Sequence, residues 1–190
     1  MSSHHIVRED QEPAVIVLTP ELLLQEKYHQ LLEWSPTIIC DFSAARALDS
    51  YGIKVDVIVD SNTHTFHQSH ISFIPLESTV LETAIDFLWR SGRKQAYVLS
   101  EAISLGLMNE LANQELGLTI LTQEARWMLI RKEYAKWYRA SELLEVLSNS
   151  SYQALGAVDA IGDNSFQTRQ DGIVRIIPEL NTWLWLKEMY

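Results

Sequence analysis

Carboxylates stand at the ends of two short apolar runs in the first third of the chain. Residues 37–40 are apolar and end at Asp41, and residues 55–59 are followed by Asp60. A helical pattern separates the runs, so the segment predicts a βαβ unit whose parallel strands are buried by helices on both faces. Because open α/β sheets bind ligands beyond the carboxyl ends of their strands, Asp41 and Asp60 are candidate catalytic or ligand-binding groups. Capping of the next element is the alternative role for both.

Three histidines recur at intervals of three in the polar stretch that follows. His64, His67 and His70 lie within residues 61–70, directly after Asp60. Three imidazoles can hold zinc, which gives a metal-dependent hydrolase as one hypothesis. Nothing in the stretch marks a helix and no cysteine lies nearby, so a solvated loop with incidental histidines is favoured.

A helix start is predicted at Thr79, because Thr79 and Glu82 have the spacing of a capping box. Apolar residues then recur every three or four positions down to Gly92, which can end the helix. The cap fully explains the types of both residues, and contact with a ligand is the alternative.

Strand and helix patterns alternate through the first two thirds of the chain. The apolar runs expected as strands are residues 14–18, 37–40, 55–59, 71–76, 95–99 and 118–122. The helical patterns between them are residues 20–34, 44–51, 79–92 and 101–116. This alternation predicts an α/β domain over residues 14–122, with a mainly parallel sheet flanked by helices. Residues 1–13 are mostly polar and charged, and we expect a flexible arm there.

The last third of the chain changes to short aromatic-rich runs. An Asp-Gly pair at residues 171–172 predicts a tight hairpin between strands at residues 165–169 and 173–177. Residues 141–147 fit a short helix and a strand equally well. These features predict a small antiparallel all-β domain, similar to a β-sandwich, over residues 123–190.

Residues 182–186 are predicted to form a strand. Successive side chains of a strand point to opposite faces, so Trp183 and Trp185 would lie on one face and Leu184 and Leu186 on the other. Core packing is the more common role of tryptophan. Stacking on an aromatic ligand and burial in a subunit contact are the alternatives.

The composition excludes several classes of partner. With 15 basic and 25 acidic residues the formal net charge is −10, so the long-range field repels nucleic acid and anionic membranes. The single cysteine, Cys40, excludes an internal disulfide and lies in an apolar run, which favours a buried, inert thiol. No apolar run approaches the roughly 20 residues of a membrane span, and the polar start does not resemble a secretory signal. We therefore expect a cytoplasmic protein with small-molecule ligands.

Two blocks of sequence resemble those of thiamin pyrophosphokinases. Residues 40–46 and 52–61 read CDFSAAR…GIKVDVIVDS, and residues 76–88 read LESTVLETAIDFL. In that family the corresponding blocks read approximately DGGANR…GIxPDxIxGDFDS and DSTDFEKAL, in the same order and with similar spacing. The resemblance implies an α/β domain followed by a β domain, ATP-dependent transfer of diphosphate to thiamin, Mg²⁺ and ATP as cofactors, and a homodimer.

The resemblance also implies roles for individual residues. Asp41, Asp60 and Glu82 take the places of catalytic acids, and Asp60 with Glu77 would ligate the metal ion. The implied ligand contacts come from both parts of the chain. They are Ser43, Arg46, Asp56, Ser78, Thr79, Asn109, Asn113 and Asn164.

The chain departs from the family at several acidic positions. The letters of GDFDS fall on residues 60–64, where Ser61 and Thr63 replace the two acids unless a one-residue gap aligns Asp60 with the first. The second acid of DSTD is Val80, which cannot ligate a metal. Magnesium requires oxygen ligands, and loss of such stabilisation costs several kcal/mol per essential group. We therefore expect slow or absent transfer by an eroded site, with a non-catalytic nucleotide- or thiamin-like binding or scaffold protein as the alternative.

Overall fold

The computed structural model describes residues 14–33, 35–62 and 66–190. The arm predicted at residues 1–13 lies outside this part of the chain. Two compact units make up the molecule. The first extends to Ile103 and also contains Glu115–Leu118, and the second contains Ser104–Gln114 and Thr119–Tyr190. The domain boundary expected after residue 122 stays a prediction.

Parallel strands form the sheet of the first unit. They are β1 (Ala14–Val17), β2 (Ile38–Asp41), β3 (Val57–Val59), β4 (Ser72–Ile74) and β5 (Gln95–Leu99). The order across the sheet is β5-β1-β2-β3-β4, and each neighbouring pair runs parallel. β1 and β3 are buried along their whole length, which explains their unbroken runs of Ala, Val and Ile. The predicted mixed α/β class is confirmed.

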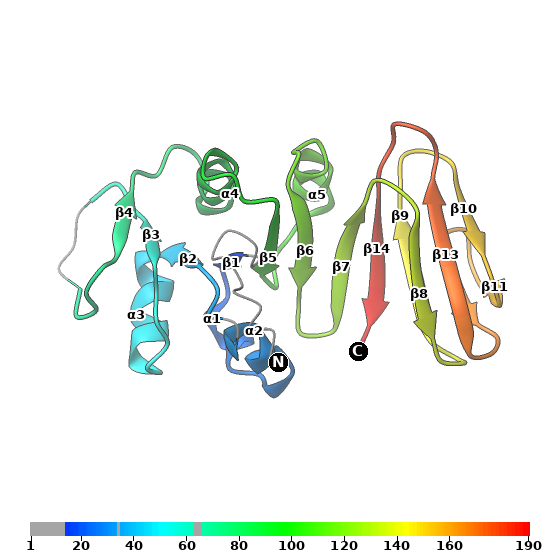
Figure 1. Ribbon diagram of the computed structural model, residues 1–190, viewed down its shortest axis with the longest axis horizontal. Coiled ribbons are helices and arrows are strands. Elements are labelled where there is room, and N and C mark those ends of the chain that lie inside the picture. The colour runs from blue at the N-terminus through cyan, green and yellow to red at the C-terminus, as the bar shows by residue number, and fades with distance from the viewer. Residues whose placement is uncertain (1–13, 34, 63–65) are drawn as a thin grey trace, which may run out of the picture. The chain divides into compact units, whose positions relative to one another are not determined.

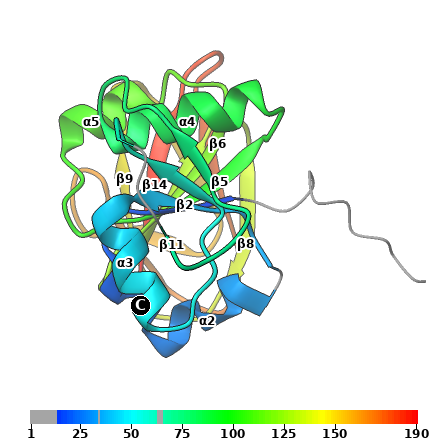
Figure 2. The same ribbon diagram turned by 90° about the vertical axis from the view of Figure 1, so that its left-hand side faces the viewer.

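Helices accompany these strands. They are α1 (Pro20–Leu23), α2 (Glu26–Glu33), α3 (Phe42–Ser50) and α4 (Val80–Arg90). Figure 1 shows α4 on one side of the strands of the first unit and α2 and α3 on the other, and the turned view in Figure 2 agrees. The single helix predicted over residues 20–34 is wrong, because the chain turns at Leu24, whose N–H donates to the Glu21 carbonyl. None of the helices in the described chain has both the length and the hydropathy of a membrane-spanning segment.

Antiparallel strands make up most of the second unit. They are β7 (Ala125–Ile130), β8 (Tyr134–Tyr138), β9 (Leu143–Leu147), β10 (Tyr152–Leu155), β11 (Val158–Ala160), β12 (Ser165–Thr168), β13 (Gly172–Pro178), β14 (Leu184–Met189) and the later part of β6 (Gly117–Leu121). The strands β11-β12-β9-β14-β7-β6 are neighbours in one sheet, and β10-β13-β8 form the other. The unit also contains α5 (Leu105–Leu111). This helix starts later than the predicted residue 101, because the Ser104 side chain caps its start, and it ends at Leu111, before the predicted residue 116.

The hairpin predicted at residues 171–172 is wrong. β12 and β13 flank that turn, but β12 pairs with β9 and β11, whereas β13 pairs with β8 and β10 in the other sheet. The connection therefore carries the chain from one sheet to the other. Asp171 holds it in place, because its Oδ1 accepts a hydrogen bond from the N–H of Ala140, just after β8, at 2.9 Å.

Apolar side chains from both sheets form a core in the second unit. Its buried members are Ile130, Tyr138, Leu144, Val146, Val174, Ile176, Leu184 and Leu186. Trp185 on β14 is also fully buried, and its Nε1 donates to the carbonyl of Met108 in α5 at 3.1 Å. Trp185 is therefore a core residue and not a platform for a ligand, whereas Trp183 precedes the strand and is half-buried.

One buried carboxylate, that of Glu188 on β14, gathers polar side chains in this unit. Arg126 donates to it from Nε at 2.5 Å and Lys136 from Nζ at 2.9 Å. The phenols of Tyr134 and Tyr138 donate to it as well. Arg126 lies opposite Glu188 on β7, and the other three are on β8, so these bonds join the two sheets.

The pKa of Glu188 reflects two opposed effects. Burial alone would raise it, but the hydrogen bonds from Tyr138 and Lys136 and the charges of Arg126 and Lys136 outweigh burial and hold the pKa below its ordinary value. A lowered pKa stabilises the fold above the unfolded-state pKa of about 4.3, and that contribution is lost as pH falls through the folded-state pKa. The Glu188 cluster thus favours the folded state at neutral pH and weakens only in acid.

Glu188→Gln is expected to lower the free energy of unfolding by about 2–3 kcal/mol at pH 7, because it leaves two partly buried cations without their counter-charge. Denaturant unfolding at several pH values measures this. The difference from wild type should shrink in acid, as the pH falls from the unfolded-state pKa of about 4.3 through the lowered folded-state pKa of Glu188.

Glu145→Gln is the matched control for this substitution. Glu145 pairs with Lys187 at 2.8 Å, but its side chain is 45% exposed. Its loss should stay under about 1 kcal/mol. Equal losses in the two variants would contradict the role given to Glu188.

Candidate functional site

Asp41, the last residue of β2, and Asp60, the residue after β3, both accept hydrogen bonds from main-chain N–H groups. Asp41 is the N-cap of α3, and its Oδ1 accepts from the N–H of Ala44 at 2.7 Å. Oδ1 of Asp60 accepts from the N–H of Asn62 at 2.9 Å. Asp41 is level with Val59 in the parallel register, so the two acids lie at the same end of neighbouring strands. Each therefore has a local structural bond at the end of the sheet where α/β folds bind ligands.

Asp56 lies at the other end of these strands. Its Oδ2 accepts from the N–H of Ile38 at 3.0 Å, and its Oδ1 is 2.5 Å from Nζ of Lys54. The first bond joins the start of β3 to the start of β2. Asp56 is thus separated from Asp41 by the length of the strands.

Ser78, Thr79 and Glu82 form one hydrogen-bonded network at the start of α4. Oγ1 of Thr79 accepts from the N–H of Glu82 at 3.2 Å, and Oε2 of Glu82 accepts from the hydroxyls of Ser78 and Thr79, both at 2.8 Å. These bonds hold the pKa of Glu82 below its ordinary value. The predicted capping box is confirmed. Glu77, just before it, is exposed, and its N–H donates to Oγ1 of Thr83 at 3.2 Å.

The acids and histidines of the described chain do not converge on a metal. Among its residues there is no group of three or more His, Cys, Asp or Glu side chains that could hold an ion. His64 lies outside the described residues. Nδ1 of His67 is 3.4 Å from Oδ2 of Asp49, and His70 is exposed.

The three asparagines that the resemblance implies as ligand contacts belong to the second unit. Nδ2 of Asn113 donates to the carbonyl of Asn109 at 3.1 Å, at the end of α5. Oδ1 of Asn109 is buried and accepts no hydrogen bond from the described chain. Asn164 accepts from the Tyr152 hydroxyl at 3.2 Å through Oδ1. A buried acceptor without a donor is unusual in a folded protein.

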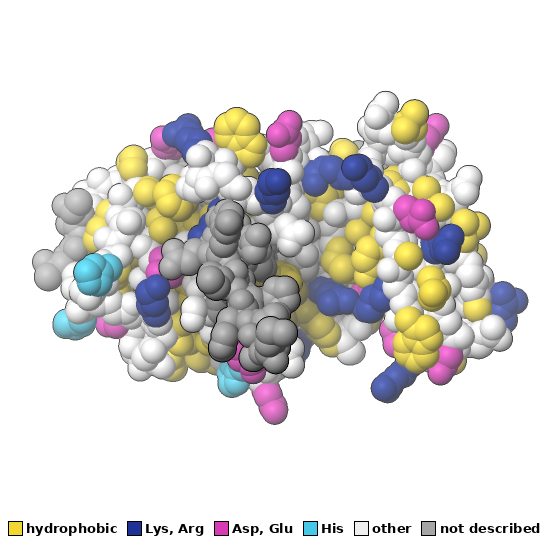
Figure 3. All heavy atoms as spheres, in the orientation of Figure 1, with side chains coloured by type: hydrophobic (Ala, Val, Ile, Leu, Met, Phe, Trp, Pro, Cys, Tyr) yellow, Lys and Arg dark blue, Asp and Glu magenta, His cyan; other side chains and the backbone are white. Residues whose placement is uncertain are grey.

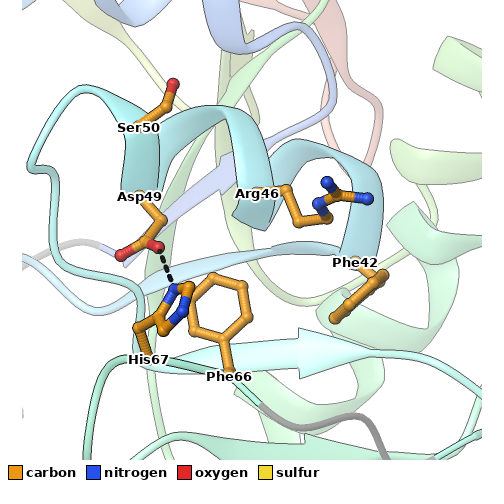
Figure 4. Close-up of a pocket in the computed structure, with 6 residues that line it drawn as sticks. All are labelled: Phe42, Arg46, Asp49, Ser50, Phe66 and His67. Carbon is orange, nitrogen blue, oxygen red and sulfur yellow. Dashed lines mark hydrogen bonds and ion pairs between the residues drawn. The ribbon is translucent and has the colours of Figure 1, made fainter.

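A hollow along α3 is a feature that the sequence did not reveal. It has a volume of about 370 Å³ and is lined by Phe42, Arg46, Asp49, Ser50, Phe66 and His67. Figure 4 shows the first four on α3, and Phe66 and His67 on the segment that follows β3. Arg46, Asp49 and Ser50 follow Phe42 by four, seven and eight positions, and this spacing places all four on one side of α3. Arg46 is exposed there, and Ser43 is exposed near the start of the same helix.

The side chain of Gln68 fixes the wall of this hollow that faces α3. Its Nε2 donates to Oδ1 of Asp49 and to the carbonyl of Ile53, both at 2.9 Å. Its Oε1 accepts from the N–H of Val55, also at 2.9 Å. The segment carrying Phe66 is therefore tied both to the end of α3 and to the chain that leads into β3.

Cys40 is buried in β2. Burial, with a smaller effect from the charge of Asp41, raises its pKa to about 12. A thiol with that pKa carries almost no thiolate at neutral pH, so Cys40 is no nucleophile.

Similarity of structure links this chain to known proteins. No family model and no curated protein matches its sequence. The thiamine pyrophosphokinase of Bacillus subtilis is 8% identical with a TM-score of 0.66, over 93% of this chain and 98% of its own. The chain has the fold of the thiamin pyrophosphokinases. The thiamin pyrophosphokinase of Candida albicans is 12% identical with a TM-score of 0.63, over 96% of this chain and 90% of its own. The yeast enzyme is 10% identical with a TM-score of 0.61, over 98% of this chain and 88% of its own.

Two substitutions of Asp41 separate the effect of its helix-capping hydrogen bond from the effect of its negative charge. Asp41→Asn is expected to leave the free energy of unfolding nearly unchanged, because asparagine caps a helix as well as aspartate does. Asp41→Ala should lower it by about 1 kcal/mol, because the Ala44 N–H loses its acceptor. Denaturant unfolding of the two variants measures the difference. If both variants lose the same free energy of unfolding, Asp41 does not stabilise the fold by capping α3.

Proposed function

We propose that this chain is a thiamin pyrophosphokinase-like protein with an eroded catalytic site, in which ATP-dependent transfer of diphosphate to thiamin is slow or absent. Its fold supports the kinship. The observation that carries the erosion is that Asp41, Asp56 and Glu82 each accept main-chain hydrogen bonds that hold a helix start or a strand in place. Asp56 also lies at the opposite end of the strands from Asp41, so these two acids do not face a common point.

The chemistry of diphosphate transfer explains why this matters. The phosphates of ATP must be held and their charge neutralised, mostly by Mg²⁺ bound through carboxylates. The residues present do not fit such a clamp, because Val80 stands where the family has an acid and the described chain holds no cluster of three candidate ligands. Asp60 and Glu77 stay predictions as metal ligands.

A non-catalytic protein that binds a nucleotide- or thiamin-like ligand, or serves as a scaffold, is the second candidate. The hollow along α3 favours ligand binding. Calorimetric titration with ATP and with thiamin tests this candidate. If neither ligand gives binding heat, retention of the family's ligand site is excluded.

We further propose a cytoplasmic homodimer, with a second copy on the outer face of the β10-β13-β8 sheet. Trp137 on β8 is directly opposite Ile173 on β13, and the two are 53% and 57% exposed. Figure 3 shows apolar side chains gathered over these strands, with charged ones among them. Beside the pair, Arg175 and Glu133 form an ion pair at 3.5 Å, so the face presents balanced charges to an identical face.

The diphosphate transfer assay tests the leading proposal. The protein is incubated with ATP, Mg²⁺ and thiamin, and thiamin diphosphate is separated by chromatography. We expect turnover at least about a thousandfold below the 1–100 per second of ordinary kinases, because each missing essential group costs several kcal/mol of barrier. Turnover within the ordinary range would refute the erosion.

The homodimer is tested by light scattering during size-exclusion chromatography. Wild type should give twice the mass of one chain. The double substitution Trp137→Lys and Ile173→Lys should give the mass of one chain, because an interface would bury the new charges without partners. Trp89→Lys is the control, since Trp89 is 56% exposed on α4 and lies outside that face. A monomeric wild type would rule the dimer out.

A further inference from the structure

Arg46 is an unusual component of the hollow along α3. Of the six lining residues it is the one permanent cation, and it forms no hydrogen bond or ion pair with any residue of the described chain. Phe42 precedes it by one helical turn on the same side of α3, which Figure 4 shows. A guanidinium can bind a planar anion through two parallel hydrogen bonds and can also stack on a flat ring. The wall formed by α3 therefore offers a binding group for an anion.

The opposite wall offers an aromatic ring. Phe66 is half-buried and meets Phe42 edge to face, with ring centroids 6.1 Å apart and an angle of 69° between the planes. An edge-to-face contact covers at most one face of a ring, so at least one face of Phe66 is not covered by Phe42. The bonds of Gln68 hold the segment that carries Phe66, so this ring is positioned before a ligand arrives.

Charge gives the hollow a direction. Asp49 accepts hydrogen bonds from Gln68 at 2.9 Å and from His67 at 3.4 Å, and lies one helical turn beyond Arg46. Its negative charge disfavours an anion at its end of the hollow, whereas Arg46 favours one at the other. A volume of about 370 Å³ is that of a site for one small molecule.

We propose that this hollow binds a small molecule made of a flat aromatic ring and one anionic group, with the ring against Phe66 and the anion on Arg46. The inference rests on the second candidate function and deepens it, because it names the chemical class of ligand for the hollow. None of the candidate catalytic acids Asp41, Asp60 and Glu82 lines the hollow, and binding there requires neither a metal ion nor the transfer of a phosphoryl group. The anionic group is a phosphate, as in a mononucleotide, or an aryl carboxylate.

Two probes distinguish these sources. AMP and nicotinate are titrated separately into the full chain in metal-free buffer of low ionic strength, and binding is followed by calorimetry. Saturable binding of AMP alone assigns the phosphate form, and binding of nicotinate alone assigns the carboxylate form. Binding of both supports the shared chemistry of ring and anion. If neither binds, the inference is overturned.

Three variants locate the binding. Arg46→Gln should weaken the bound probe by about tenfold or more, because a hydrogen bond to a charged group is lost. Phe66→Leu keeps an apolar side chain but removes the ring face, and should weaken binding by about fivefold or more. Arg90→Gln is the matched control, because Arg90 is an exposed helix arginine that pairs with Asp86 at 2.6 Å and does not line the hollow. Its affinity should equal that of wild type.

The outcomes separate this inference from the proposed function. Affinity that is unchanged in Arg46→Gln, or reduced equally in Arg90→Gln, would overturn the inference even if the transfer assay behaves as expected. Ordinary diphosphate transfer would refute the erosion and leave the binding result intact. Circular dichroism of each variant verifies that it is folded. Because Arg46 is exposed and forms no hydrogen bond or ion pair with the described chain, Arg46→Gln should fold as wild type does.

Discussion

Burial of strands on both faces is the constraint on which the first unit depends. β1 and β3 contain only Ala, Val and Ile, so polar side chains lie beyond the ends of these two strands and not within them. Main-chain N–H groups that need acceptors are found at these same places. Asp41 and Asp56 satisfy such groups at opposite ends of the strands. A carboxylate at a strand end is therefore both a natural cap and a natural ligand, and the fold alone does not choose between these roles.

This ambiguity limits what the sequence reveals about the site. The capping box at Thr79 was predictable because both partners lie within one turn, and the buried strands were predictable because their apolar runs are continuous. The hollow was not predictable, because Phe66 and His67 stand in a polar stretch without periodicity. Tertiary contacts bring them to α3: the bonds of Gln68 to Asp49 and to the chain before β3, the contact of His67 with Asp49, and the ring contact of Phe66 with Phe42. Local spacing thus specified the caps, and tertiary contacts specified the hollow.

The second unit shows the same division between local and distant signals. The Asp-Gly pair at residues 171–172 lies where a connection enters β13, but local sequence did not reveal that this connection joins two sheets. The residues of the Glu188 cluster likewise lie on three strands that are far apart in sequence, so no local sequence motif predicts the cluster. In the first unit acids act mainly on main-chain groups close by in space. In the second, one acid is bonded by side chains from 50 to 62 residues away in sequence.

The strand β4 has a consequence for how the protein behaves in concentrated solution. It comes last in the strand order and is three residues long, with Ser72 exposed. A terminal strand presents a row of N–H and C=O groups that can recruit an extended segment from another molecule. So short a row gives an incoming segment few bonds, and β4 thereby protects the parallel sheet from aggregation by edge-to-edge pairing.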